Sequence, residues 1–368
     1  MADYERKRFE GLLRQKIIIC QLSVVSFQLR SIRRRLTTDN GQRTTDKYMK
    51  ALRFTNNQLK LTEISKPKRE DEALIRVLKS GICNTDIEIV RGYAGFSGTI
   101  GHEFVGVVEE SADAKHLIGK RVVGEINAGC GVCELCKKGD SRHCPSRTVL
   151  GIHGRDGAHA EFLTLPSRNL LEVPAEVSDE SAVFVEPLAA AFGITGQVEI
   201  LPETYVAVIG DGKLGNLCAQ SVVLKSRNVV LIGKHKEKLS LLAKRNIEGV
   251  LLKDSLKLKR IFDVVIEASG SESGFSLALD LLKPRGKLVL KSTFHGQSKW
   301  EAWRVVVDEI TIVGSRCGRF APALELLRDK KIDVESLIEK RFSLSKGVEA
   351  IELAQQKGVL KVLLSMTN

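Results

Sequence analysis

The feature that most constrains the fold is a short apolar run, residues 206–209, that leads directly into the pattern Gly210-x-Gly212-x-x-Gly215. A helix-like stretch, residues 216–224, follows the last glycine. Glycines at this spacing permit a tight turn and let the backbone approach a pyrophosphate closely, while the N-terminus of the next helix faces the anion. The pattern is weak evidence alone, but between a strand and a helix it is typical of a dinucleotide-binding unit.

Further strand-like segments follow this unit at 229–232, 263–267, 286–290 and 310–313, with helical patterns between them. This alternation predicts a doubly wound parallel sheet of the Rossmann type, and hence an α/β fold. The chain has 368 residues, which is more than a single hydrophobic core usually holds, so a second domain is expected.

The charge balance of the chain argues against a nucleic-acid partner. The formal net charge is +12, but residues 1–48 alone carry 11 Lys/Arg against 5 Asp/Glu. The remainder is only mildly basic, and its Lys/Arg residues are scattered. No run reaches the roughly 18 apolar residues of a membrane span, so no membrane partner is expected.

Residues 1–48 differ in character from the rest of the chain. They contain a repeated Thr-Thr-Asp, and the chain from Met49 onward reads as a domain start. We expect an N-terminal extension that is disordered or non-native, with an ordered amphipathic helix as the alternative.

Four cysteines, Cys130, Cys133, Cys136 and Cys144, follow the spacing C-x2-C-x2-C-x7-C. Disulfides fit poorly, because residues so close in sequence bridge only in special loops. Four thiolates instead form a closed tetrahedral shell for Zn²⁺, which leaves no position for a substrate. The pattern therefore predicts a structural zinc site, with redox chemistry or chance clustering as alternatives.

A second set of donors lies on either side of these cysteines. Cys83 and His102 supply sulfur and nitrogen, and Glu103 or Glu186 supplies oxygen, which would leave one position of a zinc ion open. Taken alone, Cys83 is typical of a small buried thiol, His102 of a core histidine and Glu186 of an acid at a helix N-terminus. Their occurrence around a four-cysteine cluster favours a catalytic zinc.

The end of the second strand of the nucleotide unit bears on cofactor choice. Chains that bind NAD place an acid there, on the ribose 2′-hydroxyl. This chain has Gly233, followed by Lys234 and His235, so no carboxylate would repel a 2′-phosphate and a cation would meet it. We therefore expect NADP rather than NAD, with the alternative that Lys234 and His235 only begin a solvated helix.

Together these segments resemble the zinc-containing medium-chain dehydrogenase/reductases, of the alcohol, sorbitol and threonine dehydrogenase type. The resemblance runs from Met49 to the C-terminus and is carried, besides the cysteine lobe, by GHEFVGVV, GAHAEFLTLP, VEPLAAA, VAVIGDGKLG and DVVIEASGSESGFSLALDLLKPRGKLVL. It implies a β-rich GroES-like catalytic domain from residues 49–187 and 315–368, with the Rossmann domain, 188–314, inserted between them.

The resemblance also implies roles for individual residues. Cys83 and His102 would be ligands of the catalytic zinc, Glu186 matches a ligand position, and Glu103 would act as a ligand or from just outside the shell. Asp86 would orient a ligand and Thr85 would relay the substrate proton. The residues expected at the cofactor are Gly210, Gly212, Lys213, Leu214, Gly215, Gly233, Lys234, His235 and Arg316.

The implied activity is a zinc-dependent, NADP(H)-linked interconversion of a small alcohol or polyol with its aldehyde or ketone. The alternatives are an NAD-dependent polyol or threonine dehydrogenase, a silent dinucleotide-binding protein, and a zinc-free reductase of the same fold. A homodimer or homotetramer in the cytoplasm is expected.

Overall fold

The computed structural model describes residues 47–68, 70–292 and 301–366. Of the predicted extension, only Lys47 and Tyr48 fall within this range, and Cys20 lies outside it. Lys50–Asn368 forms one compact unit. None of the helices described is long and apolar enough to cross a membrane.

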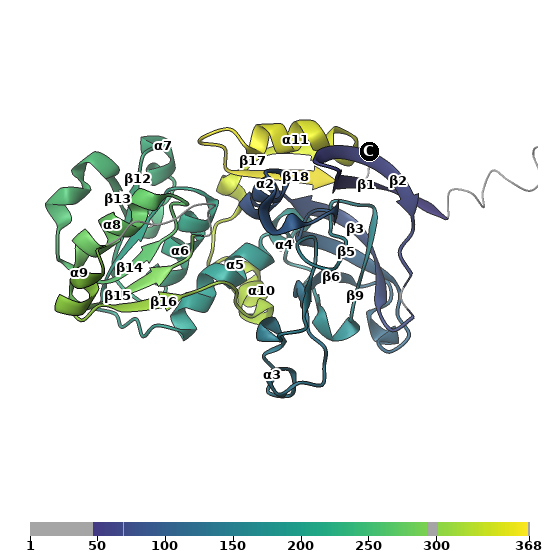
Figure 1. Ribbon diagram of the computed structural model, residues 1–368, viewed down its shortest axis with the longest axis horizontal. Coiled ribbons are helices and arrows are strands. Elements are labelled where there is room, and N and C mark those ends of the chain that lie inside the picture. The colour runs from purple at the N-terminus through teal and green to yellow at the C-terminus, as the bar shows by residue number, and fades with distance from the viewer. Residues whose placement is uncertain (1–46, 69, 293–300, 367–368) are drawn as a thin grey trace, which may run out of the picture. The chain divides into compact units, whose positions relative to one another are not determined.

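A parallel sheet forms the nucleotide half of the chain, as predicted. Its strands are ordered β13-β12-β11-β14-β15-β16, and every neighbouring pair runs parallel (Figure 1). This is the strand order of a Rossmann fold. The strands are β11 (Tyr205–Ile209), β12 (Asn228–Gly233), β13 (Glu248–Leu251), β14 (Phe262–Glu267), β15 (Leu282–Leu290) and β16 (Thr311–Gly314). The sequence did not predict β13, because its short segment EGVL carries no buried apolar run.

Helices connect these strands and pack on the sheet. α6 (Lys213–Val223) contacts β11 and β12, and α8 (Glu272–Leu281) contacts β14 and β15. The other helices between these strands are α7 (Lys236–Ser240) and α9 (Ala302–Val307). The predicted Rossmann-type part of the fold is therefore confirmed.

The remaining strands form mixed and antiparallel sheets, as a GroES-like domain requires. The largest has the order β10-β6-β5-β3-β18-β17, with β9 also paired to β3. Its strands are β3 (Ala73–Gly81), β5 (Glu103–Glu110), β6 (Arg121–Gly124), β9 (Phe162–Leu165), β10 (Leu170–Glu172), β17 (Ile338–Ser343) and β18 (Lys361–Ser365). The smaller sheets contain β1 (Tyr48–Thr55), β2 (Gln58–Ser65), β4 (Gly98–Thr99), β7 (Asn127–Ala128) and β8 (Thr148–Val149).

The C-terminal strands return to the first half of the chain. β18 pairs antiparallel with β3, and Leu363 lies opposite Gly81. The remaining α-helices of the described ranges are α2 (Asn84–Val90), α3 (Glu134–Lys137), α4 (Asp179–Ala182), α5 (Val185–Phe192), α10 (Phe320–Arg328) and α11 (Gly347–Ala354). The predicted domain boundaries stay a prediction, and the one at residue 187 falls within α5.

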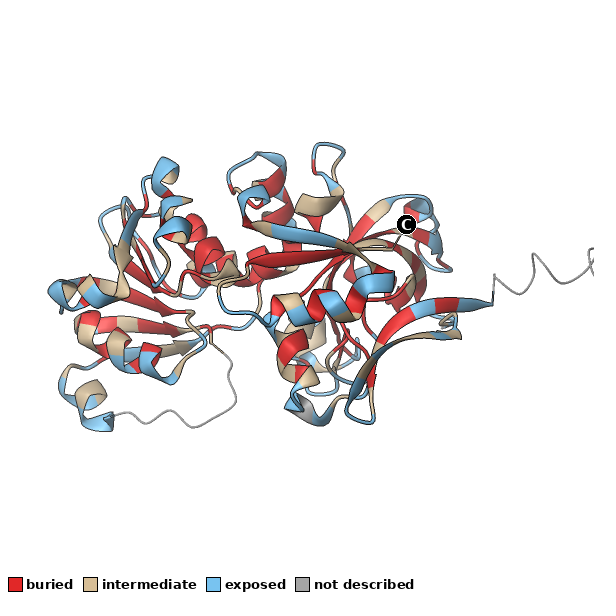
Figure 2. Cartoon of the chain, turned by 90° about the horizontal axis from the view of Figure 1, so that it is seen from above, coloured by how far each residue is buried: buried red, intermediate tan, exposed pale blue. Residues whose placement is uncertain are grey.

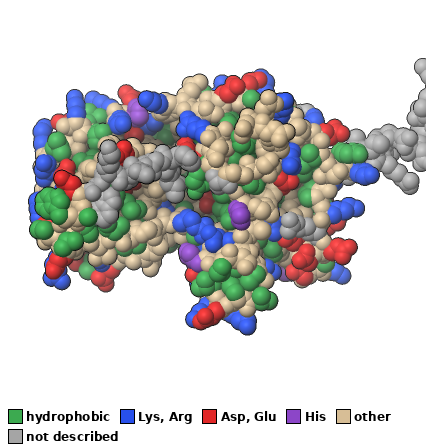
Figure 3. All heavy atoms as spheres, in the orientation of Figure 1, with side chains coloured by type: hydrophobic (Ala, Val, Ile, Leu, Met, Phe, Trp, Pro, Cys, Tyr) green, Lys and Arg blue, Asp and Glu red, His purple; other side chains and the backbone are tan. Residues whose placement is uncertain are grey.

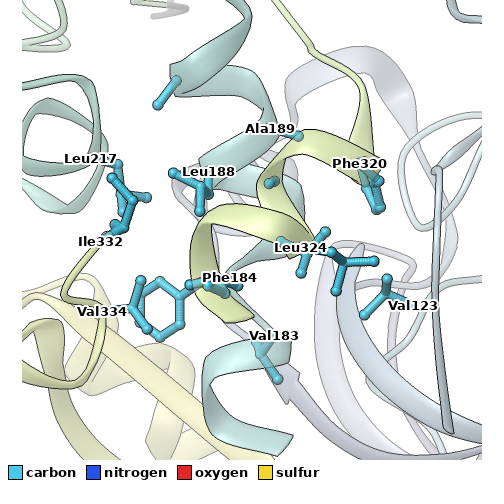
Figure 4. Close-up of a cluster of buried hydrophobic side chains, with 14 of the residues drawn as sticks. Val123, Val183, Phe184, Leu188, Ala189, Leu217, Phe320, Leu324, Ile332 and Val334 are labelled. Atoms are coloured by element: carbon cyan, nitrogen blue, oxygen red, sulfur yellow. The ribbon is translucent and has the colours of Figure 1, made fainter. Parts of the chain in front are cut away.

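Helices α5, α6 and α10 share one buried cluster (Figure 4). α10 buries Phe320, Ala323, Leu324 and Leu327, which recur at the spacing of one helix face. Leu188 of α5 and Leu217 of α6 are fully buried in the same cluster. Figure 2 shows that buried residues gather on the strands, while the helices expose their outer sides. Each large apolar side chain buried in this way contributes about 1.5–3 kcal/mol.

Candidate active site and cofactor cleft

Asp86 holds the local structure around two of the predicted ligands. Cys83 precedes α2, and its backbone N–H donates to Asp86 Oδ2 at 2.8 Å. The backbone N–H of Gly101 donates to Asp86 Oδ1 at 3.0 Å. Asp86 is fully buried, and its Oδ1 lies 3.4 Å from Nδ1 of His102. One carboxylate thus fixes the segments that carry Cys83 and His102, as an orienting group would.

Charged neighbours shift the pKa values of Asp86 and His102. Burial alone would raise the pKa of Asp86, but the charges and hydrogen bonds of His102 and His159 outweigh it and hold the pKa well below its usual range. Burial would lower the pKa of His102, and the charges of Asp86 and Cys83 instead raise it well above 6.5. The surroundings of His102 therefore stabilise positive charge.

Cys83, His102 and Glu103 could hold a metal ion together. Their ligand atoms all lie within 4.8 Å of one another. Oε1 of Glu103 is buried and has no hydrogen-bond partner among the described residues, as expected for an atom that awaits a ligand. Sulfur, imidazole nitrogen and carboxylate oxygen are the donors that zinc takes in proteins, so the residues fit zinc.

Glu186, the other predicted oxygen donor, lies outside this group of three but in the same cleft wall. Burial raises the pKa of its carboxyl, and the charge of His102 opposes that shift. Thr85 lies beside Cys83, whose thiol donates a hydrogen bond to Thr85 Oγ1 over 3.7 Å. Both side chains line the cleft.

Two further buried residues belong to this site, and the sequence did not single them out. Lys361 of β18 donates a hydrogen bond to Glu103 Oε2, and both side chains are almost fully buried. His159 shares a 2.8 Å hydrogen bond with Ser80 and lies 3.6 Å from Asp86. The signal for His159 was its place in GAHAEFLTLP, and that for Lys361 was a charged residue beside the apolar run of β18.

The four predicted zinc-binding cysteines lie close together in the structure. The sulfur atoms of Cys130, Cys133, Cys136 and Cys144 all lie within 4.8 Å of one another, which fits a four-thiolate zinc shell. Backbone N–H groups of Val132 and Cys133 lower the pKa of Cys130 to about 6, while burial raises that of Cys136 to about 11. Gly131 has φ +80°, a conformation that other residues rarely adopt.

The predicted glycine loop has the geometry that a dinucleotide requires. Gly210 has φ +116°, and a Cβ atom there would lie 2.6 Å from the carbonyl oxygen of Ala268. A Cβ atom at Gly212 would meet nothing within 4 Å, so the backbone is open where α6 begins. The side chain of Asn216 donates to the carbonyls of Asp211 and Gly212 at 2.9 Å and steadies the loop.

The end of β12 is not free of carboxylates, as the residues after it had suggested. Gly233 stands where NAD-binding chains have an acid, but the carboxylate of Asp211, from the glycine loop, lies beside it. Asp211 Oδ2 accepts hydrogen bonds from the backbone N–H groups of Lys234 and His235, both at 2.7 Å, and lies 3.0 Å from Nδ1 of His235. Asp211 follows β11, not β12, so the residues after the second strand gave no sign of it.

Arg316 and Lys291 line the part of the cleft near the C-terminal end of the parallel sheet. Arg316 donates to Asn127 Oδ1 at 3.0 Å and to the carbonyl of Arg142 at 2.6 Å, so it also holds the segment around the cysteines. Lys291, which the sequence did not single out, donates to the carbonyl of Ala190 at 2.8 Å. Figure 3 shows Lys, Arg and His side chains gathered above the segment that carries α3.

One cleft of about 1690 Å³ joins these parts. Its wall includes the three candidate metal ligands Cys83, His102 and Glu103. It also includes Thr85, Glu186, Arg316, the glycine loop and the end of β12. All the residues predicted for the cofactor except Gly215 line it. Gly215 instead lies under the loop, where a Cβ atom would overlap the carbonyl oxygen of Gly210. The four cysteines are not among the lining residues.

Known families match both halves of the chain. The Alcohol dehydrogenase GroES-like domain matches residues 69–175, and the Zinc-binding dehydrogenase family matches residues 214–329. An L-threonine 3-dehydrogenase from Chelativorans sp. (strain BNC1) is 33% identical over 240 residues, which cover 60% of this chain and 69% of the relative.

Solved structures show the same fold. A zinc-binding dehydrogenase structure from Sinorhizobium meliloti 1021, bound to NADP, has a TM-score of 0.79 and 27% identity and covers 86% of this chain and 99% of its own. An alcohol dehydrogenase from Escherichia coli CFT073, complexed with NADH, has a TM-score of 0.78 and 27% identity and covers 87% of this chain and 100% of its own.

The chain belongs to the zinc-containing medium-chain dehydrogenase/reductase family. It is an alcohol dehydrogenase-like oxidoreductase with a GroES-like part and a Rossmann-type part. The family supports zinc and a nicotinamide cofactor, and its solved relatives include one with NADP and one with NADH.

Proposed function

We propose that the chain interconverts a small alcohol or polyol with its aldehyde or ketone, with zinc and a nicotinamide as cofactors. The observation that carries the proposal is the single cleft whose wall contains both the Cys83–His102–Glu103 group and the glycine loop before α6. A metal-ligand set and a dinucleotide loop in one cleft would bring a substrate oxygen and a nicotinamide together.

Different residues of the cleft would bind the metal, position its ligands and transfer the proton. Cys83 and His102 would hold the catalytic zinc, together with Glu103 or Glu186. Such an ion would act as a Lewis acid and lower the pKa of a substrate hydroxyl. Asp86 holds Cys83 and His102 in place through its hydrogen bonds and charge. Thr85 Oγ1, beside Cys83, is placed to take the proton of the substrate hydroxyl.

The nucleotide side of the cleft would orient the cofactor. The exposed backbone at Gly212 and the N-terminus of α6 suit a pyrophosphate, and Arg316 and Lys291 add positive charge to the cleft wall. The four cysteines, outside the cleft, would hold a structural zinc and take no part in turnover.

The test is an activity panel of alcohols, polyols and aldehydes with NAD(H) and NADP(H), run before and after chelation. We expect substrate-dependent changes in nicotinamide absorbance that chelation abolishes, and about two zinc ions per chain by elemental analysis. A chain that binds dinucleotide but turns over no member of the panel, with or without added zinc, would contradict the proposal. The cytoplasmic location and the dimer or tetramer stay predictions, which cell fractionation and sedimentation would test.

A further inference from the structure

We propose that Asp211 replaces the acid that is missing at the end of β12, and that it makes the chain prefer NAD to NADP. This inference rests on the proposed function, because it assigns the cofactor of that same cleft. It also reverses the preference that the residues after β12 suggested when they were considered alone.

The geometry at Gly233 is the first observation. A Cβ atom built at Gly233 would lie 2.5 Å from both Cγ and Oδ2 of Asp211. A side chain at position 233 is therefore excluded, because the carboxyl group of Asp211 fills the space in which it would begin. The glycine and the aspartate are two parts of one arrangement, in which the acid comes from the glycine loop instead of from the strand.

The hydrogen bonds of Asp211 are the second observation. Oδ2 takes all three contacts, with the backbone N–H groups of Lys234 and His235 and with Nδ1 of His235. Oδ1 accepts no hydrogen bond from any residue in the described ranges. The carboxylate is thus fixed through one oxygen, and the other is left to accept a hydrogen bond in the cleft, where a ribose 2′-hydroxyl could donate one.

The competing charge nearby is weaker. Lys234 and Lys238 line the same cleft and would attract a 2′-phosphate, but the side chain of Lys234 is exposed and that of Lys238 is half-buried, so water and salt screen both charges. The side chain of Asp211 is only 11% exposed, and a charge so enclosed acts more strongly on a phosphate beside it. The balance at this end of the cleft therefore favours a hydroxyl over a phosphate.

The experiment compares ADP-ribose with 2′-phospho-ADP-ribose by isothermal titration calorimetry at fixed ionic strength. Hydrogen bonds to charged groups contribute enough for about a tenfold difference, so the unaltered chain should bind ADP-ribose about tenfold more tightly or better. Asp211→Asn keeps the shape but removes the charge, and it should reduce this ratio to about threefold or less. Glu237→Gln is the matched control: it makes the same change of charge at an exposed position of α7 outside the cleft wall, and it should leave the ratio unchanged.

Equal binding, or tighter binding of the 2′-phosphorylated ligand, by the unaltered chain would overturn the inference and leave the proposed function intact. This measurement needs no variant, so it decides the matter even if Asp211→Asn does not fold. A ratio that Asp211→Asn leaves unchanged in a folded protein would also overturn the inference. Binding of neither ligand would overturn the dinucleotide cleft itself, and with it both proposals.

Discussion

The substitution Asp86→Asn tests how a buried carboxylate organises the metal group. The carboxylate accepts one backbone hydrogen bond at each oxygen, from Cys83 and from Gly101, and it faces the imidazole of His102. An amide offers one acceptor oxygen in place of two, so one of the two buried N–H groups loses its partner. The charge that stabilises a cation at this place is lost as well.

These contacts set the expected losses of stability and of zinc affinity in Asp86→Asn. A buried donor without a partner costs about 1–3 kcal/mol, and the lost charge adds to that, so the free energy of unfolding should fall by about 2–4 kcal/mol. Groups that orient metal ligands contribute a factor of about 10–100 to metal affinity. The variant should therefore lose the proposed catalytic zinc to a competing chelator at a concentration about 10–100 times lower.

Two measurements test this expectation: urea denaturation for stability and competition with a chelating dye for zinc. Asp308→Asn is the control, because the carboxylate of Asp308 pairs with half-exposed Arg260 at 2.8 Å, and the loss of this solvent-screened pair should lower stability far less. An Asp86→Asn protein with normal zinc affinity and normal stability would refute the reasoning.

The pH dependence gives an independent check on Asp86. Its pKa is lower in the folded chain than the usual value of about 4 in an unfolded one. The stabilisation from its charge is thus fully present above about pH 4 and is lost as the pH falls further. The difference in stability between the unaltered chain and Asp86→Asn should shrink below about pH 4. A difference that stays constant down to the acid transition would show that charge is not the cause.

Three more predictions concern the zinc sites and their surroundings. Cys83→Ala and His102→Ala should abolish turnover and leave dinucleotide binding intact, as activity and calorimetry would show; full activity in either variant would contradict the assignment. Cys144→Ser should lower the zinc content from about two ions per chain to about one and destabilise the protein, with elemental analysis and thermal unfolding as the measurements. Lys361→Met should lower the free energy of unfolding by about 3 kcal/mol or more, because it leaves the buried carboxylate of Glu103 without its ammonium. Urea denaturation measures that loss, and a Lys361→Met protein as stable as the unaltered one would show that the pair contributes nothing.

The amino-acid sequence alone determined the features that depend on near neighbours in the chain. The strand, the glycines and the helix of the nucleotide unit are contiguous, and the cysteine segment closes within fifteen residues, so local spacing was sufficient to predict both. Cys83, Thr85 and Asp86 could be chosen together because a single helix start holds them.

Only the tertiary structure decided which distant groups meet. Lys361 reaches Glu103 across 258 positions of the chain, because β18 and β5 both pair with β3. Asp211 reaches the end of β12 because parallel pairing brings the ends of β11 and β12 to the same edge of the sheet. Sheet register and chain crossing set such contacts, and a linear pattern of residue types does not contain them. For that reason the residues after β12 alone suggested a site open to a 2′-phosphate, where the folded chain places a carboxylate.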